Sequence, residues 1–402
     1  MITKLTIRNF KAISNLSIKL TPLTILIGEN SCGKSTVLQA LDFLCSAVSR
    51  DIGEYLNDRE WEFDDIRSQF ASKDDSISFE AEIDIDGKNL FWEISINNDG
   101  GKKWLVRERI ADKNTRKLYL SFGMEKEDGY PNNFSSFNIQ SSVLKILNTD
   151  RQNSEKGPFD DVLFKLKLFL TSSSSFELLS PDRMRSKGSR GQANDIGMGG
   201  ERLAAFIHGM TVSQKNDLSK IVSEFVGYDV KVTTAKNRSF GWVEMYLEEV
   251  WGKEGVKVKK RYISDGLLRI IAFSAILVNQ DSKPVERGVT KGLILLDEIE
   301  DGIHPSLSES VVNKFKEAAL KFRKQVIITS HSPVMVNFSD IHGIQFMWRD
   351  SKGKVYAKPL FQTKEMRETL DFLNPGEVWL NYTKDDIIKR LSTADGAGAA
   401  HD

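Results

Sequence analysis

The segment GENSCGKS at residues 28–35 constrains the fold of this chain more than any other feature. It satisfies the spacing G-x-x-x-x-G-K-[ST], which between a strand and a helix cradles phosphate groups. An apolar, β-branched run at residues 23–27 precedes it, and residues 36–44 follow with apolar side chains at helical spacing. A glycine-rich turn in that setting directs backbone N–H groups and the positive end of the helix into one cavity. The sequence therefore predicts a polyphosphate site on an α/β framework.

Two side chains of this segment have a direct chemical use in a phosphate site. Lys34 is placed to reach the β- and γ-phosphates, and the Ser35 hydroxyl is placed to hold Mg²⁺. The alternative, a glycine-rich turn that binds nothing, does not account for a full match with both flanks. Cys32 makes the loop a candidate for oxidation, although a small residue that fits the turn is the simpler interpretation. The residues expected to line the site are Gly28, Glu29, Asn30, Ser31, Cys32, Gly33, Lys34, Ser35 and Thr36.

The composition disfavours several classes of protein. The 402 residues carry 56 basic and 56 acidic side chains, so no overall basic field draws the chain to nucleic acid or membrane. No apolar stretch approaches the roughly 20 residues of a membrane span, and the first residues lack a signal-peptide core. The two cysteines, Cys32 and Cys45, form no disulfide framework. We therefore expect a cytoplasmic protein of one large domain or two to three smaller ones.

Local patterns outline an α/β core with additional sheets. Apolar or alternating runs predict strands at residues 5–7, 16–18, 77–83, 91–96, 104–110, 117–122, 230–234, 242–248, 256–262, 293–296 and 326–328. Apolar side chains at helical spacing predict helices at residues 159–170, 201–226, 267–278, 311–322 and 363–390. The helix at 311–322 would join two buried strands, and strand–helix–strand is the order that a parallel core requires.

These patterns divide the chain into four segments. They are residues 1–135 with the phosphate loop and an antiparallel sheet, 136–265 with a helical lobe and an insertion, 266–362 with the rest of the core, and 363–402 with a helical tail. Residues 123–160 and 181–200 are rich in small and polar residues and are expected to form an exposed excursion and a loop. Small residues at 394–400 predict a disordered end.

An apolar strand that ends in two carboxylates is the expected companion of the phosphate loop. Residues 293–296 are apolar, and Asp297 and Glu298 follow directly. Asp297 would hold Mg²⁺ through water at the end of the strand, and Glu298 would polarise the attacking water as general base. Such a run alone is common and often carries no function. Its pairing with residues 28–35 makes it specific.

A single histidine stands at the end of the next predicted strand. His331 follows residues 326–328, within the hydroxyl-rich sequence at 329–333. A lone histidine is more often an ordinary core or surface residue than a catalytic one. Because open α/β sheets bind ligands beyond the carboxyl ends of their strands, this position favours a contact between His331 and the γ-phosphate.

Residues 264–266 precede the apolar helix at 267–278 and predict a second anion site. Ser264 would cap the helix, and Gly266 would sit at its N-terminus, where backbone N–H groups point outward. An ordinary helix cap is the better interpretation of these residues taken alone. Residues 300–305, shortly after Glu298, are predicted to form a tight turn.

Taken together, these motifs resemble the ATPase heads of the ABC type, and among them the branch of the RecF, SMC and OLD proteins. The segments that carry the resemblance are residues 7–11 (IRNFK), 28–35, 179–183 (LSPDR), 264–266 (SDG), 297–305 (DEIEDGIHP) and 329–333 (TSHSP). They frame residues 1 to about 362 and are specific as a set. The resemblance implies an α/β head with a mostly parallel phosphate-loop sheet, an antiparallel β subdomain and a helical lobe that carries the signature.

The resemblance also implies a mechanism with ATP and Mg²⁺ as cofactors. The implied metal ligands are Ser35 and Asp297, and the implied catalytic residues are Lys34, Glu298 and His331. Two heads would associate head to tail around two ATP molecules, with Ser264 and Gly266 of one copy against the γ-phosphate held by the other. Loss of that phosphate would release the joining contacts. The turn at Asp301 would lie at the interface, and Phe10, Arg8 or Lys11 would flank the nucleotide.

The sequence departs from these relatives in three places. Its signature is S-D-G rather than the L-S-G-G-Q of membrane transporters. The glutamine expected before the antiparallel sheet has only Gln69 as a weak candidate. Roughly 40 residues follow the last core strand, too few for the TOPRIM nuclease that is fused in OLD proteins. We therefore expect an effector such as a nuclease or toxin to be a separate chain, as for compact bacterial ATPases of this appearance in anti-phage defence.

Two basic clusters are candidates for contact with a phosphate backbone. The first cluster lies in the predicted loop and comprises Arg183, Arg185, Lys187 and Arg190. A flexible loop has little structural need for four cations, so DNA contact and a bland role are weighed equally there. The second cluster comprises Lys257, Lys259, Lys260 and Arg261. A solvated strand face is the favoured interpretation of the second cluster.

Four functions are compatible with these features. The leading one is a dimeric ATP-hydrolysing switch that acts on DNA or gates a partner effector, in anti-phage defence. A RecF-like repair and recombination ATPase is the alternative. A transporter subunit fits less well because of the S-D-G signature and the turn at 300–305. An inactive ATP-binding scaffold is disfavoured by the intact Glu298 and His331.

Overall fold

The computed structural model describes residues 1–72, 75–98, 104–123, 139–147, 159–176, 180–186, 193–236, 241–251, 254–279, 292–321 and 323–392. The strands are β1 Ile2–Phe10, β2 Ile13–Lys19, β3 Leu23–Gly28, β4 Ile77–Ile85, β5 Lys88–Asn98, β6 Trp104–Asp112, β7 Leu118–Phe122, β8 Ser174–Phe176, β9 Val230–Lys236, β10 Val243–Trp251, β11 Glu254–Lys259, β12 Leu293–Leu296, β13 Gln325–Thr329, β14 Ile344–Arg349 and β15 Val355–Pro359. The helices are α1 Lys34–Ser49, α2 Ile52–Asp58, α3 Phe63–Ile66, α4 Val143–Ile146, α5 Phe159–Thr171, α6 Pro181–Arg185, α7 Leu203–Gly209, α8 Val212–Val226, α9 Asp265–Asn279, α10 Ser308–Lys321, α11 Pro333–Asn337, α12 Lys364–Glu368, α13 Pro375–Asn381 and α14 Lys384–Ser392, with short 3₁₀ turns η1 Lys260–Tyr262, η2 Pro305–Leu307, η3 Ile341–Gly343 and η4 Thr369–Asp371. Lys187, Arg190 and residues 394–400 lie outside the described residues.

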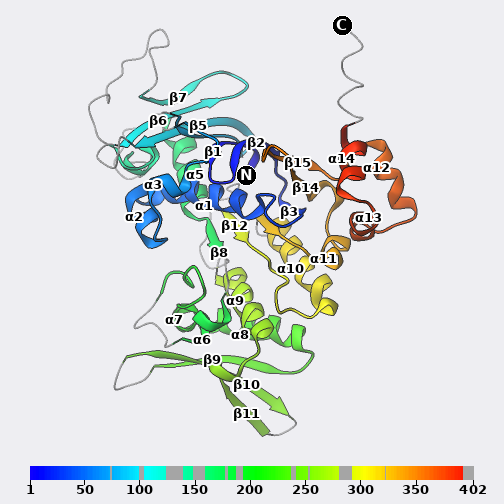
Figure 1. The fold of residues 1–402 in the computed structure, drawn as a ribbon. Helices are drawn as coiled ribbons and strands as arrows, with labels where there is room; N and C mark the ends of the chain where they lie inside the picture. Colours follow the sequence, from blue (N-terminus) through cyan, green and yellow to red (C-terminus); the bar gives the residue numbers. More distant parts are fainter. Residues whose placement is uncertain are drawn as a thin grey trace.

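A six-stranded sheet in the middle of the molecule carries the phosphate loop (Figure 1). Its strand order is β15-β14-β3-β13-β12-β8, and all neighbouring strands run parallel except the edge pair β14 and β15. The expected buried strands at 293–296 and 326–328 correspond to β12 and β13. Because parallel strands end at one edge of the sheet, the segments after β3, β12 and β13 open toward the same side. This confirms the mostly parallel core that the sequence predicts.

Both faces of the central sheet are covered, which explains why its strands are apolar at consecutive positions. In β12, Leu293 and Leu295 pack with α1 and the antiparallel sheet, whereas Ile294 and Leu296 pack with α9 and α10. Successive side chains of a strand point to opposite faces, so one short run serves two hydrophobic cores. The central sheet therefore joins the N-terminal part of the molecule to the lobe below it (Figure 1).

The expected antiparallel sheet lies on the other side of α1 from the central sheet (Figure 1). Its strand order is β2-β1-β4-β5-β6-β7, and every neighbouring pair is antiparallel. Burial alternates residue by residue along β4, as the sequence pattern predicts. Asp86 and Gly87 join β4 to β5 with φ of 54° and 80°, the left-handed conformation that two-residue hairpin turns require.

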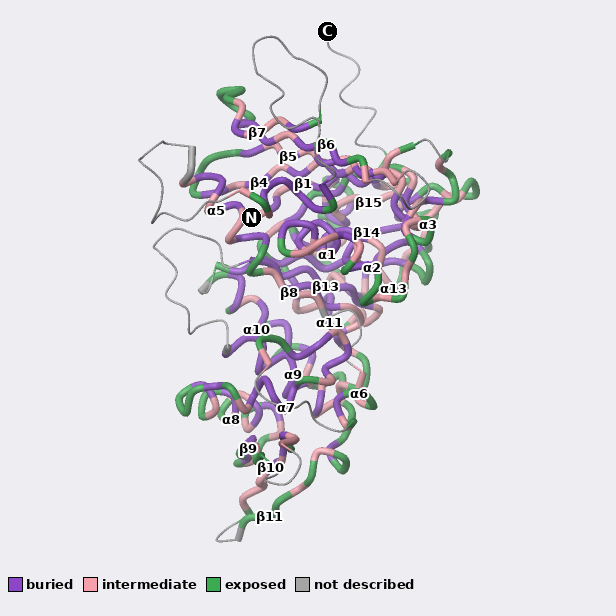
Figure 2. Tube along the Cα trace, turned by 90° about the vertical axis from the view of Figure 1, so that its left-hand side faces the viewer, coloured by how far each residue is buried: buried purple, intermediate pink, exposed green. Residues whose placement is uncertain are grey.

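A lobe formed by α6 to α9 and the antiparallel sheet β11-β10-β9 extends from the other face of the central sheet (Figure 1). The helix α8 packs against both β9 and α9. Figure 2 shows buried residues where α7, α8 and α9 meet and exposed residues toward the tip formed by β11. Thus the lobe is helical where it joins the core and has a β-sheet at its free end.

The C-terminal helices α12 to α14 lie beside β14, β15 and α11, on the side of the molecule opposite α2 and α3 (Figure 1). The closest packing is between α11 and α13, where Gly376 lies against the Pro333 carbonyl. A Cβ atom at Gly376 would come within 1.9 Å of that oxygen, so the two helices meet backbone to backbone. In the part of the chain that the structure describes, no helix has both the length and the apolar character needed to cross a bilayer.

Several elements differ from those expected. The strands β8, β14 and β15 complete the central sheet, although no strand was predicted there; β8 (Ser-Ser-Phe) is a strand because β12 pairs with its backbone. The predicted loop at 181–200 begins with α6. The predicted helix at 201–226 is divided into α7 and α8, because Thr211 and Gln214 form a capping box that starts a new helix.

Candidate nucleotide-binding site

The phosphate loop connects β3 to α1 as predicted, and two of its glycines are required by geometry. Gly28 ends β3 with φ of 146°, and a Cβ atom there would lie 2.1 Å from the Met347 carbonyl oxygen of β14. Gly33 precedes α1 with φ of 99° and packs against Val355 of β15. A side chain at Gly28 would displace β14, and at either position it would strain the backbone. The neighbouring strands therefore shape the loop as much as its own sequence does.

Lys34 lies inside this loop and is 5% exposed. Its Nζ donates to the carbonyl oxygens of Gly28 at 3.0 Å and Glu29 at 2.9 Å. Burial lowers the pKa of Lys34, and the nearby carboxylates of Asp297 and Glu298 act in the opposite direction. This arrangement suits a polyphosphate with a metal ion, because the ammonium can pair with phosphate oxygens and the carboxylates can bind the metal.

The two carboxylates at the end of β12 are tied to β13 by one hydroxyl. Thr329 donates its hydroxyl to the Asp297 carboxylate and accepts the backbone N–H of Glu298 at 2.9 Å. Glu298 has φ of 45°, a left-handed conformation that is uncommon for a residue other than glycine. The turn after β12 is therefore strained at Glu298 and held there by Thr329.

His331 lies next to these carboxylates. Its Nε2 is 3.7 Å from Glu298 Oε1, and its backbone N–H donates to the Glu300 carboxylate. The other carboxylate oxygen of Glu300 is buried without a hydrogen-bond partner, and burial raises the pKa of Glu300. Glu300 thus fixes the backbone at His331 through one carboxylate oxygen. The sequence placed Glu300 only in a turn and missed this contact.

The residues present fit a nucleotide with Mg²⁺. Ser35 supplies a hydroxyl at the start of α1, and Asp297 supplies a carboxylate at the end of β12, both of which are oxygen ligands that Mg²⁺ accepts. Among the described residues, no group of three or more His, Cys, Asp or Glu side chains is arranged to hold a metal ion by itself. Mg²⁺ commonly completes its shell with water and phosphate oxygens, so this donor set suits a metal that arrives with the nucleotide.

Residues 264–266 contact α6 and the turn at 300–305. Arg185 of α6 donates to the Ile263 carbonyl at 2.7 Å and pairs with the Asp265 carboxylate. Gly266 lies against Gly302, so closely that a Cβ atom there would be 2.0 Å from the Gly302 carbonyl oxygen. Ser264 is exposed. Residues 264–266 are therefore held by α6 and by the turn at 300–305 of the same chain, and Ser264 is left exposed to another molecule.

The first basic cluster is divided by the structure. Arg183 and Arg185 lie on the short helix α6, rather than in the predicted loop. Arg183 is exposed, whereas Arg185 is half-buried and engaged with Asp265. Arg185 therefore has a structural role that the sequence did not reveal, because it supports residues 264–266. Lys187 and Arg190 lie outside the described residues.

The second basic cluster lies on β11 and η1, and Lys257 in it faces an acidic partner. Lys257 pairs with Glu248 across the hairpin at 3.3 Å, and its amine lies 4.4 Å from the centre of the Tyr246 ring. Lys260 donates to the Ser186 carbonyl. The contacts of Lys257 are those of a solvated strand face, the interpretation that the sequence favours for this cluster, whereas Lys260 is half-buried on η1.

Phe10 does not flank the nucleotide. It is fully buried, and its ring packs against Phe43 and Phe79 with centroid separations of 5.8 and 5.5 Å. Arg8 pairs with Glu80 on the adjacent strand β4. The expectation is wrong for Phe10, because β1 directs its side chain into the core, whereas for Arg8 it stays a prediction.

Lys11 and Gln69 lie at the outer end of the β1–β2 hairpin. Lys11 donates to Gln39 of α1 at 2.8 Å and lies 3.3 Å from the centre of the Trp61 ring. Gln69 is exposed, directly after Ser68, whose backbone N–H donates to the carbonyl of Asn9. For both residues, a place beside the nucleotide stays a prediction.

Cys32 is buried within the phosphate loop, with Sγ 4.0 Å from Lys34 Nζ. Burial raises the pKa of the Cys32 thiol, although Lys34 acts to lower it. Because the thiolate is the reactive form, these surroundings disfavour oxidation. The structure supports the simpler interpretation of a small side chain that fits the turn.

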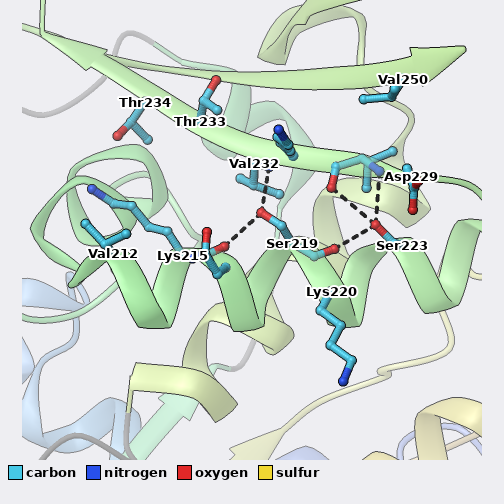
Figure 3. A pocket seen from close by; sticks show the side chains of 13 residues that line it. Val212, Lys215, Ser219, Lys220, Ser223, Asp229, Val232, Thr233, Thr234 and Val250 are labelled. Atoms are coloured by element: carbon cyan, nitrogen blue, oxygen red, sulfur yellow. Dashed lines mark hydrogen bonds between the residues drawn. The ribbon is translucent and has the colours of Figure 1, made fainter. Parts of the chain in front are cut away.

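A cavity of ≈670 Å³ lies in the lobe between α8 and β9 (Figure 3). Ser219 accepts the backbone N–H of Val232 and Ser223 that of Val230, each at 3.0 Å. Figure 3 shows these hydroxyls between helix and strand, while Lys220 points away from the strand. The serines thus close the edge of β9, and none of the residues predicted to bind nucleotide lines this cavity.

Comparison with known proteins agrees with this geometry. The sequence matches, over residues 23–337, the family described as "AAA domain, putative AbiEii toxin, Type IV TA system". The match runs from the start of β3 to the end of α11 and so contains the phosphate loop, the signature and the carboxylates after β12. The chain belongs to this family. No curated protein matches the chain.

Solved structures identify the fold. An SMC head crystallised with the C-terminal winged-helix domain of ScpA aligns with 17% identity and a TM-score of 0.51, covering 91% of this chain and 99% of that one. An SMC head from Thermotoga maritima aligns with 12% identity and a TM-score of 0.48, covering 89% and 98%. The first of these likenesses agrees with the sheet order and the family, and it shows the fold of an ABC-type ATPase head as found in SMC proteins.

Proposed function

We propose that this protein binds and hydrolyses ATP and that two copies close around the nucleotide as a reversible switch. The observation that carries the proposal is the meeting of three separate segments at one edge of the central sheet. The carboxylates of Asp297 and Glu298 act to raise the pKa of Lys34, which burial lowers. The Nε2 atom of His331 lies 3.7 Å from Glu298 Oε1. Segments more than 250 residues apart in sequence therefore combine the parts that phosphoryl transfer to water requires.

Each side chain has a defined part in hydrolysis. Lys34 would exchange the carbonyls of Gly28 and Glu29 for phosphate oxygens, and the N–H groups at the start of α1 would bind the same phosphates. Glu298 would accept a proton from the attacking water, and His331 would hold the γ-phosphate. Mg²⁺ bound by Ser35 and Asp297 would neutralise charge on the phosphate oxygens.

Association of two copies would complete the site. Ser264 is exposed directly before α9, which begins at Asp265. Backbone N–H groups at that end would bind the γ-phosphate held by the other copy. The phosphate would then be a shared ligand of two protomers, and its hydrolysis would remove the contact that joins them.

We further propose that this switch gates a separate effector, in defence against phage. The family description names a toxin and a type IV toxin–antitoxin system, and the similar SMC head was crystallised with a domain of another protein. Direct contact with DNA, through Arg183 and its neighbours, stays a prediction. No described contact favours the RecF-like alternative over the gated effector.

The switch is tested by trapping it. In Glu298→Gln, ATP binds but the water is not activated, so light scattering with Mg²⁺ and ATP should show a dimer that persists for hours, whereas the wild type returns to monomer as ATP is consumed. Lys34→Ala is the control that lacks the phosphate contact and should stay monomeric. A Glu298→Gln protein that is monomeric at saturating ATP contradicts the proposal.

A further inference from the structure

The start of α9 and the turn after β12 form one closely packed unit. Gly266 meets Gly302 backbone to backbone, and Gly302 itself has φ of 71°. A Cβ atom at Gly266 would clash with the Gly302 carbonyl oxygen, whereas one at Gly302 would make ordinary contact with Gly266 and is disfavoured only by the positive φ. Movement of α9 is therefore passed to the turn, and movement of the turn is passed to α9.

Arg269, one turn into α9, spans the same junction. Its Nη1 lies 3.5 Å from the carbonyl oxygen of Glu298 and 3.6 Å from the carboxylate of Asp301. Both separations are longer than an ordinary N–H···O bond. The Nε of Arg269 is buried without a hydrogen-bond partner. The guanidinium is thus enclosed beside two acceptors while its donors are incompletely used.

The position of Glu298 depends on its backbone. Its φ of 45° is maintained by the hydrogen bond from its N–H to Thr329 on one side, and its carbonyl faces Arg269 on the other. A residue held in an unfavourable conformation moves readily when one of its supports changes. A change in this backbone turns the Cα–Cβ bond of Glu298 and so shifts the positions that its carboxylate can reach.

We propose that Arg269 is a positioning residue that couples the signature helix to Glu298 of the same protomer. This inference rests on the proposed ATPase function. When residues 264–266 engage the γ-phosphate held by the other copy, a small shift of α9 brings the guanidinium into full hydrogen bonds with the Glu298 carbonyl and Asp301. Glu298 then adopts its active position over the nucleotide of its own protomer. Each site is thereby readied for hydrolysis by engagement of the other.

Arginine is needed for this coupling because its planar fork can serve two acceptors at once. Lysine carries the same charge but offers a compact ammonium on a flexible stem, which cannot hold Glu298 and Asp301 in one fixed geometry. The substitution Arg269→Lys therefore keeps the charge and most of the packing and removes the bridge. Arg202→Lys is the matched control, since Arg202 forms an exposed ion pair with Asp195 elsewhere in the lobe.

The test separates binding from turnover in the full chain. For wild type, Arg269→Lys and Arg202→Lys, we would measure the Kd of a fluorescent ATP analogue, the kcat for Mg²⁺-ATP, and dimer formation by light scattering in the Glu298→Gln background. Arg269→Lys should lower kcat at least about 10-fold, since a misplaced general base forfeits much of its effect. Its Kd should change less than about twofold, and the trapped dimer should still form. Arg202→Lys should match the wild type in all three.

A double-mutant cycle with Asp301→Asn sharpens the result. If Arg269 acts through the turn, the two substitutions together should lower kcat little more than either alone. The inference is overturned if Arg269→Lys turns over ATP like the wild type, if nucleotide affinity and thermal stability fall in parallel with kcat, or if the two losses multiply. A wild type that turns over ATP no faster than Lys34→Ala refutes the ATPase function itself, and the coupling with it.

Discussion

Single residues of the candidate site are held by more partners than their proposed roles require. Lys34 is bonded to two loop carbonyls, and Thr329 serves Asp297 and Glu298 at once. Polar groups in a low-dielectric interior must be satisfied by neighbours, and the same neighbours then fix their geometry. Such residues are sensitive to small changes in size and charge, which makes them suitable for direct tests.

Lys34→Ala should abolish nucleotide binding without unfolding the protein. Two charge-assisted contacts to phosphate would be lost, each worth about 1.5–3 kcal/mol, so the Kd for Mg²⁺-ATP should rise at least about 100-fold. Removing a buried ammonium whose pKa is lowered by burial should not reduce thermal stability. Fluorescence titration with an ATP analogue measures the first effect. Lys384→Ala, which removes the exposed Lys384–Glu29 pair at the edge of the loop, is the control and should bind ATP normally.

Glu108 provides a pH-dependent test outside the nucleotide site. It is fully buried in β6 and accepts hydrogen bonds from Trp92 at 2.8 Å, Ser142 at 2.7 Å and the Val143 backbone at 2.6 Å. Burial raises the pKa of Glu108 from 4.5 to about 7. The folded protein therefore holds a proton that the unfolded chain releases, and the stabilisation is present below pH 4.5 and lost as the pH rises through about 7.

The Glu108→Gln substitution removes this titration. Urea unfolding at pH 5 and pH 8 should show the wild type losing roughly 3 kcal/mol more stability between the two pH values than Glu108→Gln loses. The side-chain NH₂ of the new glutamine also faces the Val143 N–H, which is itself a donor. The free energy of unfolding of Glu108→Gln should therefore be lower by an amount that does not depend on pH. Glu54→Gln, at an exposed position on α2, should show the same change in unfolding free energy between pH 5 and pH 8 as the wild type. Equal pH dependence in all three proteins would contradict the assignment.

At the scale of secondary-structure elements, contacts between backbones decide the arrangement. The helices α11 and α13 meet at Gly376, the strands β3 and β14 at Gly28, and α9 meets the turn after β12 at Gly266. Each contact excludes a Cβ atom, so each pair of elements has a single spacing. The position of an element then depends on glycines in its neighbours.

Gly266→Ala should separate α9 from the turn at 300–305. The new methyl would lie 2.0 Å from the Gly302 carbonyl oxygen, and a clash of backbone with side chain at that distance forces the helix to move. In the Glu298→Gln background, light scattering should therefore show loss of the ATP-dependent dimer, while one protomer still binds ATP through its own phosphate loop. Gly53→Ala is the control, because a Cβ atom there meets nothing within 4 Å. Normal dimer formation by Gly266→Ala would count against the assigned contact.

At the scale of the whole molecule, acidic and basic side chains balance, and this limits how nucleic acid could be bound. The net charge is +0, so attraction to DNA must come from local groups. Arg185 and Lys257 are committed to carboxylates, whereas Arg183 is exposed on α6. Any contact by the described part of the first cluster therefore depends mainly on Arg183.

DNA binding should follow that difference. We expect Arg183→Ala to weaken binding to duplex DNA and to reduce the slope of log affinity against log salt by about one, because one phosphate contact is lost. Lys257→Ala should leave the slope unchanged. Anisotropy titrations from about 50 to 200 mM salt measure both. A wild-type affinity that is independent of salt would exclude phosphate contacts and leave the partner protein as the target of the switch.

The phosphate loop, the carboxylates after β12 and the alternation of the antiparallel sheet were all predictable, because each depends on neighbours within a few residues. Gly28, Lys34 and Ser35 lie within eight consecutive positions, and Asp297 directly follows an apolar run. The strands β8, β14 and β15 were missed because their pairing is imposed by the strands beside them. The place of Phe10 was wrong, since the face of β1 that meets α1 is decided only when the two pack.

The sequence by itself predicted the chemistry: it indicates which side chains would bind phosphate and metal and which would activate water. Only the tertiary structure decided how those side chains are held. Thr329 joins β12 to β13, Glu300 fixes His331, Arg185 supports the signature, and Arg269 faces Glu298 from α9. The partners in these contacts lie up to 80 residues apart in the chain, and local propensity contains no information about pairs at that distance. Packing of the sheet and the lobe brings them together.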